Sequence, residues 1–334
     1  MKRRMFSHLS LTGGLGILSN PLFEMNKTNK DPIRVGIIGL DTSHSIAFAK
    51  IINEKNADGT STSGFEVTHA YPHGSRDIES SVNRIPGYSK EILGLGIEIV
   101  DSIDALLDQS EAILLETNDG RMHLEQAIQV FERGLITFID KPIAASLADT
   151  LKIFDASEKN GVPMFSASSL RYGPSIQEIA NGNKIGRILG ADTFSPAKIE
   201  KTHPDLFWYG IHGVESLFTL MGVGCKSVVR LHKPDVDVVT GVWEDDRIGT
   251  FRGLRSGKTG YGGTAYGTEG ISEAGKYEGY EPLVHEILKF FRSGIAPISA
   301  SETIEIFAFM AAAEESKNRG GDSVSLSEVM EAAK

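Results

Sequence analysis

The sequence predicts an α/β protein, with a parallel sheet of βαβ units in the N-terminal half and a C-terminal α/β domain built on a mostly antiparallel open sheet. Two observations lead to this fold class. Between residues 33 and 166, short apolar runs alternate with segments of helical periodicity, the pattern of parallel strands joined by crossover helices. From about residue 175 to 300 the alternation stops, and glycine-rich turns separate the apolar runs. A chain of 334 residues has room for two domains.

The elements of the first half follow from local patterns. Short apolar runs of the kind that form buried parallel strands occupy residues 33–39, 65–71, 112–117, 135–140 and 162–166. Apolar residues at helical spacing predict helices over 45–53, 122–133 and 147–160. Gly161 is placed to end the last of these helices.

The second half is expected to carry the antiparallel sheet. Apolar runs bounded by turns predict strands over 188–194, 226–231, 236–243, 248–254 and 262–267. Two helices are expected after them, an amphipathic one over 282–293 and another over 301–318. No internal repeat, heptad run or long low-complexity segment interrupts the pattern.

The loop after the first predicted strand, Gly39-Leu40-Asp41-Thr42-Ser43-His44, departs from the G-x-G-x-x-G dinucleotide fingerprint. Its first glycine is present, but Asp41 and His44 hold the second and third glycine positions. Two interpretations stay open. In one, the N-terminus of the next helix still binds a phosphate, Thr42, Ser43 and His44 add donors, and Asp41 turns away as a cap. In the other, the site has lost its dinucleotide and holds something else.

The end of the second predicted strand bears on the choice of cofactor. Dinucleotide sites usually place an acid here to hold the adenosine ribose, and this sequence has none directly at the strand end. Ser75 and Arg76 follow instead, and an arginine fork suits a 2′-phosphate. This pattern favours NADP over NAD, and a polar surface loop is the alternative interpretation.

A lysine stands at the carboxyl end of another predicted strand, in Phe138-Ile139-Asp140-Lys141-Pro142. Open α/β sheets bind ligands at these strand ends. A lysine in such a cleft can hold a substrate hydroxyl and lower its pKa by its charge, and its own pKa shifts readily on burial. Lys141 is therefore the strongest single candidate for a catalytic residue.

A second candidate segment surrounds His212 and combines polar groups with aromatic rings: His203, Asp205, Trp208, Tyr209, His212 and Glu215. Flat apolar faces with a few polar anchors suit a sugar pocket, so we expect substrate contacts here. A histidine titrates near neutral pH and can serve as a general base. No tight HxxxH or CxxC spacing supports a metal site in this segment, and no metal is expected.

Together these segments resemble the Gfo/Idh/MocA oxidoreductase family, whose Lys-Pro and Gly-x-His-x-x-acid motifs are matched by Lys141-Pro142 and Gly210-x-His212-x-x-Glu215. The resemblance covers nearly all of residues 33–330. It implies a Rossmann NAD(P)-binding domain over 31–168 and a substrate and oligomerisation domain over 169–300. It also implies that the helix of segment 301–334 packs back on the N-terminal domain.

The function implied by the resemblance is NAD(P)-dependent oxidation or reduction at a hydroxyl of a carbohydrate or polyol. Lys141 would then orient and polarise the hydroxyl, and His212 would take its proton. The resemblance also implies cofactor contacts after the third and fourth strands and at the domain exit, by Thr117, Asn118, His123, Asp140 and Arg171.

Two departures from the family pattern leave alternatives open. Asp140 stands where the family usually has glutamate, and Trp208 stands where many members have an aspartate that assists the histidine. That assisting carboxylate is either missing or replaced by Asp205 or Glu215. The alternatives are an NAD-assisted enzyme that cleaves glycosides or eliminates from sugars without net redox, and a non-catalytic ligand-binding protein.

Charge and the N-terminus bear on partners and location. A net charge of −10 disfavours sequence-independent binding to nucleic acid. Lys2-Arg3-Arg4 and the weakly apolar stretch Leu9–Leu18 resemble a Tat export signal, so a periplasmic protein without membrane insertion of the mature chain is expected. A basic cytoplasmic tail is the alternative. The open C-terminal sheet is expected to form a homo-oligomer, a dimer or tetramer.

Overall fold

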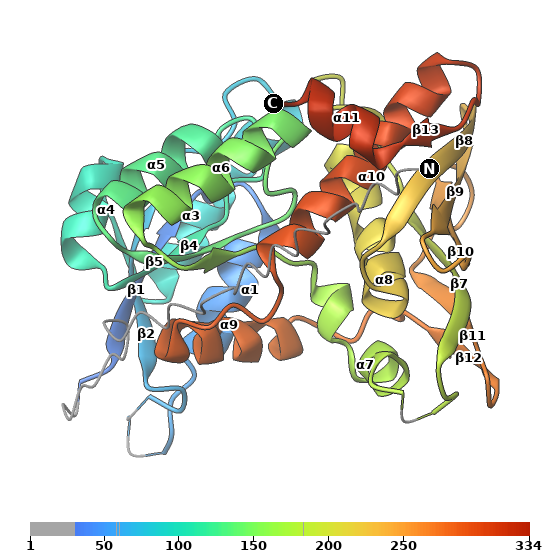
Figure 1. Cartoon of the computed structure of the whole chain (residues 1–334). Helices are drawn as coiled ribbons and strands as arrows, with labels where there is room; N and C mark the ends of the chain where they lie inside the picture. Colours follow the sequence, from blue (N-terminus) through green and yellow to red (C-terminus); the bar gives the residue numbers. More distant parts are fainter. Residues whose placement is uncertain (1–30, 58, 60, 183) are drawn as a thin grey trace, which may run out of the picture.

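The computed structural model describes residues 31–334 except 58, 60 and 183, so the expected export signal lies outside the described residues. In the described part of the chain, no helix has the length and apolar character needed to cross a lipid bilayer. Two sheets stand side by side in Figure 1, each with its own helices.

The N-terminal sheet has six parallel strands in the order β3-β2-β1-β4-β5-β6. Its strands are β1 (Ile33–Ile38), β2 (Phe65–Tyr71), β3 (Glu98–Ile99), β4 (Ala112–Leu115), β5 (Ile136–Ile139) and β6 (Met164–Phe165). The central strands β4 and β5 are buried throughout, as the continuous apolar runs predict. The order reverses between β1 and β4, which is where open α/β sheets bind ligands.

Helices connect these strands: α1 (Ser43–Ile52), α2 (Glu79–Val82), α3 (Ile85–Gly94), α4 (Ile103–Gln109), α5 (His123–Glu132) and α6 (Leu147–Asn160). Ser102 and Ser146 cap α4 and α6 by accepting a backbone N–H. Gly161 ends α6 in the left-handed conformation, with φ of 63°. The predicted doubly wound α/β domain is thus confirmed.

The C-terminal sheet has seven strands in the order β12-β11-β7-β10-β9-β8-β13. They are β7 (Ile188–Pro196), β8 (Cys225–Lys233), β9 (Val236–Trp243), β10 (Ile248–Leu254), β11 (Gly262–Gly267), β12 (Ile271–Ala274) and β13 (Val324–Ser325). Only the β7–β10 pair among them is parallel in the described residues. The predicted mostly antiparallel sheet is confirmed.

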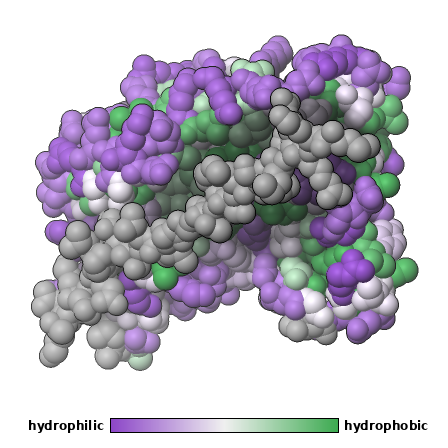
Figure 2. All heavy atoms as spheres, in the orientation of Figure 1, coloured by the Kyte–Doolittle hydropathy of each residue, from purple (hydrophilic) through white to green (hydrophobic). Residues whose placement is uncertain are grey.

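The remaining elements join the two sheets: η1 (Ser169–Tyr172), α7 (Pro174–Ala180), η2 (Leu206–Gly210), α8 (Ile211–Met221), α9 (Glu281–Ser293), α10 (Ala300–Asn318) and α11 (Leu326–Ala332). Helix α10 packs against α8 on one side and α6 on the other (Figure 1). Helix α9 returns to the N-terminal sheet, where Phe290 meets Phe165 with ring centroids 4.9 Å apart. One continuous cluster of buried apolar residues therefore spans both sheets, which fixes the cleft between them. Figure 2 shows polar residues over most of the visible face, with hydrophobic ones in the hollow between the sheets and on the lower right, at the C-terminal sheet.

Candidate active site

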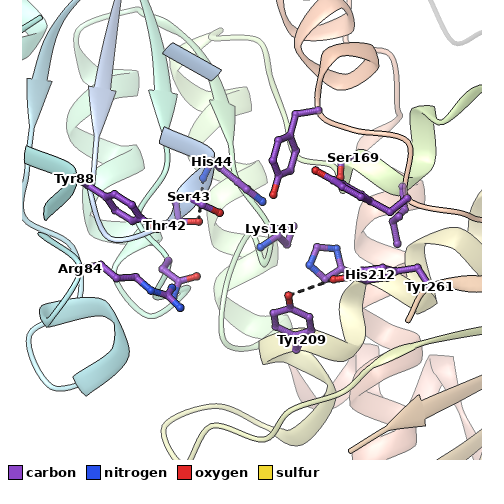
Figure 3. Close-up of a pocket in the computed structure, with 14 residues that line it drawn as sticks. Thr42, Ser43, His44, Arg84, Tyr88, Lys141, Ser169, Tyr209, His212 and Tyr261 are labelled. Carbon is purple, nitrogen blue, oxygen red and sulfur yellow. Dashed lines mark hydrogen bonds between the residues drawn. The ribbon is translucent and has the colours of Figure 1, made fainter. Parts of the chain in front are cut away.

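A cavity of about 290 Å³ opens at the carboxyl ends of the central parallel strands. The start of α1 contributes Thr42, Ser43 and His44 to its wall, and the loop after β5 contributes Lys141. From the other side, η2 and the start of α8 present Tyr209 and His212 (Figure 3). The two strongest sequence-predicted residues, far apart in the chain, thus meet in one cleft.

Lys141 lies at the floor of this cleft and is 6% exposed. Its ammonium nitrogen is 3.8 Å from Oδ2 of Asp140, and Asp140 Oδ2 is also 2.8 Å from Nδ1 of His44. Burial alone would raise the pKa of Asp140, but the charges of His44 and Lys141 outweigh it and lower that pKa. Asp140 therefore stays ionised, and it holds the ammonium group despite being one methylene shorter than glutamate.

His212 stands in the first turn of α8, fully inside the protein except at the cleft. Burial, together with the charges of Lys141 and His44, lowers the pKa of His212 well below 6.5. Nδ1 of the ring is 2.8 Å from the hydroxyl oxygen of Ser168. When Nδ1–H donates to that oxygen, Nε2 carries the free lone pair. The geometry thus gives a neutral imidazole that can accept a proton, as a general base must.

The carboxylates expected to assist His212 lie elsewhere. Asp205 accepts hydrogen bonds from Arg230 and Lys317, at 2.6 and 2.7 Å. Glu215 accepts from the backbone N–H of Ser168 and from Nε of Arg171, both at 2.8 Å. Glu215 therefore reaches His212 only through Ser168, whose position it fixes. No sequence pattern marks the Ser168 hydroxyl, because a serine carries no catalytic signature outside a motif.

Aromatic residues form much of the remaining wall. The Tyr209 and Tyr261 hydroxyls are 3.2 Å apart, and the Tyr209 ring packs edge-on against His212 with centroids 5.0 Å apart. Tyr280 meets His44 in the same way at 4.8 Å, and Tyr277 also lines the cleft. Burial raises the pKa of Tyr280 to about 12. Neutral phenols and flat ring faces fit a small polyhydroxylated ligand.

Asp41 does not cap α1, contrary to the first interpretation of the loop. Thr42 is the cap and accepts from the His44 backbone N–H at 3.4 Å. The buried Asp41 carboxylate instead accepts backbone N–H groups from two other loops, Asn118 at 3.0 Å and Ser75 at 3.1 Å. Burial raises its pKa although both hydrogen bonds lower it. Asp41 thus joins the loops that follow β1, β2 and β4.

Replacing Asp41 by asparagine should test this role. The two N–H groups bind different carboxylate oxygens, so in asparagine one of them would face the amide oxygen and the other the NH₂ group. Losing a charge-assisted hydrogen bond of this kind costs about 1.5–3 kcal/mol, so we expect a loss of that size in urea unfolding. Asp108→Asn, at an exposed ion pair with Arg133, is the control and should change little. Equal stability of both variants would contradict the role.

A second cavity, of about 260 Å³, lies at the ends of β2 and β3. Arg76, Gly74 and Met122 are among the residues that line it. Ser75 is turned away, because its hydroxyl donates to Asp119 at 2.8 Å. Gly74 touches Asp41 so closely that a Cβ there would fall 2.2 Å from the carboxylate. Asp41 therefore stands between the two cavities: it touches Gly74, which lines the second, and binds Asn118, which lines the first.

Three other predicted cofactor residues, Thr117, His123 and Arg171, contact neighbouring protein groups. Both ring nitrogens of the buried His123 face backbone carbonyls, of Thr117 at 2.6 Å and Ile143 at 3.1 Å. Thr117 packs beneath Gly39, where a Cβ would lie 2.6 Å from the Thr117 nitrogen. Arg171 pairs with Glu215 and Glu302. None of these three side chains lines either cavity.

Two predicted substrate residues also lie apart from the cleft. His203 and Trp208 pack together with ring centroids 4.9 Å apart, and neither lines the cavity. Nε2 of His203 is 3.4 Å from Asp119. Of the segment from His203 to Glu215, Tyr209 and His212 are the side chains that reach the cavity.

The two cavities and the start of α1 fit a dinucleotide held in two halves. The first turn of α1 borders the first cavity, and helix N-termini present free N–H groups to phosphate. Gly39 lets β1 approach Thr117 closely, as the first fingerprint glycine does. Asp41 is the discordant group, yet two backbone N–H groups already bind its carboxylate.

Fold and site thus define a two-domain Rossmann protein with its cleft at the switch point of the parallel sheet. Residues 33–168 match the family model of Gfo/Idh/MocA, the oxidoreductase family with an NAD-binding Rossmann fold. The match covers the part of the chain that forms the parallel sheet.

Individual proteins are also similar to this chain. An uncharacterized oxidoreductase from Streptococcus pneumoniae is 25% identical over 144 residues, a match that spans 38% of this chain and 39% of the relative. Among solved structures, a probable dehydrogenase from Thermotoga maritima is similar with a TM-score of 0.72 and 18% identity, covering 89% of this chain and all of that one. Scyllo-inositol dehydrogenase from Lactobacillus casei, with bound NAD(H) and scyllo-inositol, gives a TM-score of 0.68 and 14% identity over 89% of this chain and all of the other. At these identities the structures show the shared fold.

Proposed function

We propose that this protein is an NAD(P)-dependent oxidoreductase that acts on a hydroxyl group of a carbohydrate or polyol. The observation that carries the proposal is the meeting of Lys141 and His212 in one tyrosine-lined cleft bordered by the start of α1. The bound scyllo-inositol of the similar Lactobacillus casei structure supports a polyol as substrate class.

The protein's own groups supply binding and proton transfer. The Lys141 ammonium, held by Asp140, donates to the substrate oxygen and stabilises negative charge on it. His212, neutral because of burial, takes the hydroxyl proton at Nε2, while Ser168 holds Nδ1. Tyr209 and Tyr261 offer hydroxyls and ring faces to the sugar.

The residues that would hold the cofactor lie on both sides of Asp41. Ser43, the first-turn N–H groups of α1 and Asn118 border the first cavity, and Arg76 lines the second. Arg84, at the start of α3, adds a positive charge to the first cavity. A bound nicotinamide supplies hydride chemistry. Arg76 remains the basis for proposing NADP over NAD.

Mass spectrometry of small molecules released from the purified, denatured protein tests the proposal, followed by spectrophotometry of NAD(P) reduction with a polyol panel. We expect bound or bindable dinucleotide and reduction with at least one polyol. A protein that neither carries nor binds NAD or NADP would contradict the proposal. That result would favour a non-catalytic ligand-binding protein, an alternative supported by the carboxylate of Asp41 between the cavities.

The C-terminal sheet is the proposed surface of a homo-oligomer. Large apolar side chains are exposed along its strands: Leu189, Phe194, Leu231, Ile248, Tyr266 and Ile271. Apolar side chains gathered on one sheet suit a subunit interface. We expect light scattering to report a dimer or tetramer, and Leu231→Glu with Ile248→Glu to give a smaller species. A monomeric wild-type protein at micromolar concentration would contradict this.

Export remains a proposal from the N-terminal sequence, which resembles a twin-arginine signal. We expect the chain to be recovered from the periplasm, and Arg3→Lys with Arg4→Lys to retain it in the cytoplasm. Cytoplasmic recovery of the unaltered chain would favour the basic tail.

A further inference from the structure

Glu116 follows β4 and is a buried acid without a partner. Its side chain is 0% exposed, and neither carboxylate oxygen has a hydrogen-bond partner within the described residues. Oδ1 of Asp140 and the hydroxyl of Thr117 are also buried without a hydrogen-bond partner in the described residues. An ionised carboxylate buried without compensation costs several kcal/mol, so this group requires a proton or a cation.

The surrounding groups converge on one point. Three buried residues, His44, Glu116 and Asp140, each offer one potential ligand atom, and these three atoms lie within 4.8 Å of one another. Nδ1 of His44 is 2.8 Å from Oδ2 of Asp140. Atoms bound to one metal at about 2.0–2.2 Å are separated by less than about 4.5 Å, so small side-chain movements bring all three onto a single ion.

Carboxylates outnumber the cationic groups in this region, and a bound cation compensates them. Glu116 and Asp140 supply two negative charges, and Asp41 lies close enough to act on Glu116. Facing them, Lys141 contributes one positive charge at 3.8 Å from Asp140. The three carboxylates outnumber the single ammonium group of Lys141, and a divalent ion bound by Glu116 and Asp140 compensates the excess negative charge.

We propose that His44, Glu116 and Asp140 bind one divalent metal ion at the edge of the cleft. One imidazole nitrogen and two carboxylate oxygens are a ligand set that suits Zn²⁺ or Mn²⁺. Glu116 and Asp140 directly follow the neighbouring strands β4 and β5, and His44 stands in the first turn of α1. His44 lines the cavity, so the ion reaches the site from the cleft. This inference does not depend on the proposed oxidoreductase activity.

Calorimetric titration of the EDTA-dialysed full chain with ZnCl₂ and with MnCl₂, without nucleotide or sugar, tests the site. We expect one ion per chain and a raised melting temperature for at least one metal. Glu116→Gln and His44→Phe should each weaken binding at least about 100-fold. Matched controls are Glu125→Gln and His69→Gln, which alter residues on α5 and β2 outside the cluster, and both should bind like the wild type.

Three results would overturn the site. The first is a wild-type chain that binds neither ion, with Glu116→Gln at least as stable, which identifies Glu116 as a protonated acid. The second is unchanged binding by Glu116→Gln, which places the ion elsewhere. The third is loss of binding in His69→Gln. Circular dichroism of each variant confirms that a loss of binding does not come from unfolding.

Discussion

Replacing His212 by alanine is expected to lower kcat/KM for the polyol by about 10²–10⁴-fold, the usual contribution of a general base. His212 is the neutral imidazole in the cleft, and its neighbour Lys141 cannot take a proton while it is charged. The measurement is the initial rate of NAD(P) reduction with the most active polyol. His285→Ala, at an exposed position on α9, is the control and should keep the wild-type rate.

The pH dependence of the wild type checks the same assignment. Because burial lowers the pKa of His212 well below 6.5, the base stays unprotonated through neutral pH. The acid limb of kcat/KM should therefore lie below pH 6.5. Stability follows the same direction, since the unfolded chain protonates this histidine first. The folded state then loses stability as the pH falls from 6.5 towards the folded pKa.

Ser168→Ala separates the base from its support. Ser168 holds Nδ1 of His212, so its loss should reduce kcat more than it changes KM, and Ser168→Thr should recover part of the rate. A His212→Ala variant with the rate and pH profile of the wild type would exclude this histidine as the base. Binding of the polyol without turnover in all variants would favour the ligand-binding alternative.

In this fold, the elements that could be predicted from the sequence are the long segments with a strong hydrophobic period. The expected strands over 236–243, 248–254 and 262–267 coincide with β9, β10 and β11, and burial alternates along β9 and β10. The residues from 79 to 109, which form α2, α3, β3 and α4, escaped prediction. These elements have two to ten residues, too short for a period to stand out. Their structure depends on tertiary packing: β3 and α4 contact β2, and α3 contacts α1 and β3.

The site was predictable where a side chain follows a strand. Lys141 comes directly after a buried run and a proline marks the strand end, so its place in the cleft could be inferred. Tyr261, Tyr277 and Tyr280 could not, because they stand in a glycine-rich segment after β10 whose path depends on the whole C-terminal domain. Asp41 presents a different limit: the local sequence suggested a helix cap, and this was wrong because its carboxylate binds backbone N–H groups of loops far away in the chain.

Replacing Arg171 by methionine is expected to destabilise the protein by about 3–5 kcal/mol, the usual cost of removing one partner from a buried ion pair. Arg171 is 7% exposed, and its guanidinium lies 2.8 Å from both Glu215 and Glu302. Methionine fills a similar volume, so the loss should come from Glu215, which is left buried without its cation. Urea unfolding followed by circular dichroism measures it.

A surface pair gives the matched control. Arg133 pairs with Asp104 and Asp108 but is 43% exposed, and Arg133→Met should cost at most about 1 kcal/mol. The double variant Arg171→Met with Glu215→Leu should regain part of the lost stability, because it removes the unpaired charge as well. A loss below 1 kcal/mol in Arg171→Met would mean that solvent or a proton compensates Glu215. Glu215 also accepts the backbone N–H of Ser168, and the Ser168 hydroxyl contacts Nδ1 of His212. Arg171→Met should therefore displace His212 as well. If the ion pair anchors the catalytic base, stability and turnover decline together in this variant.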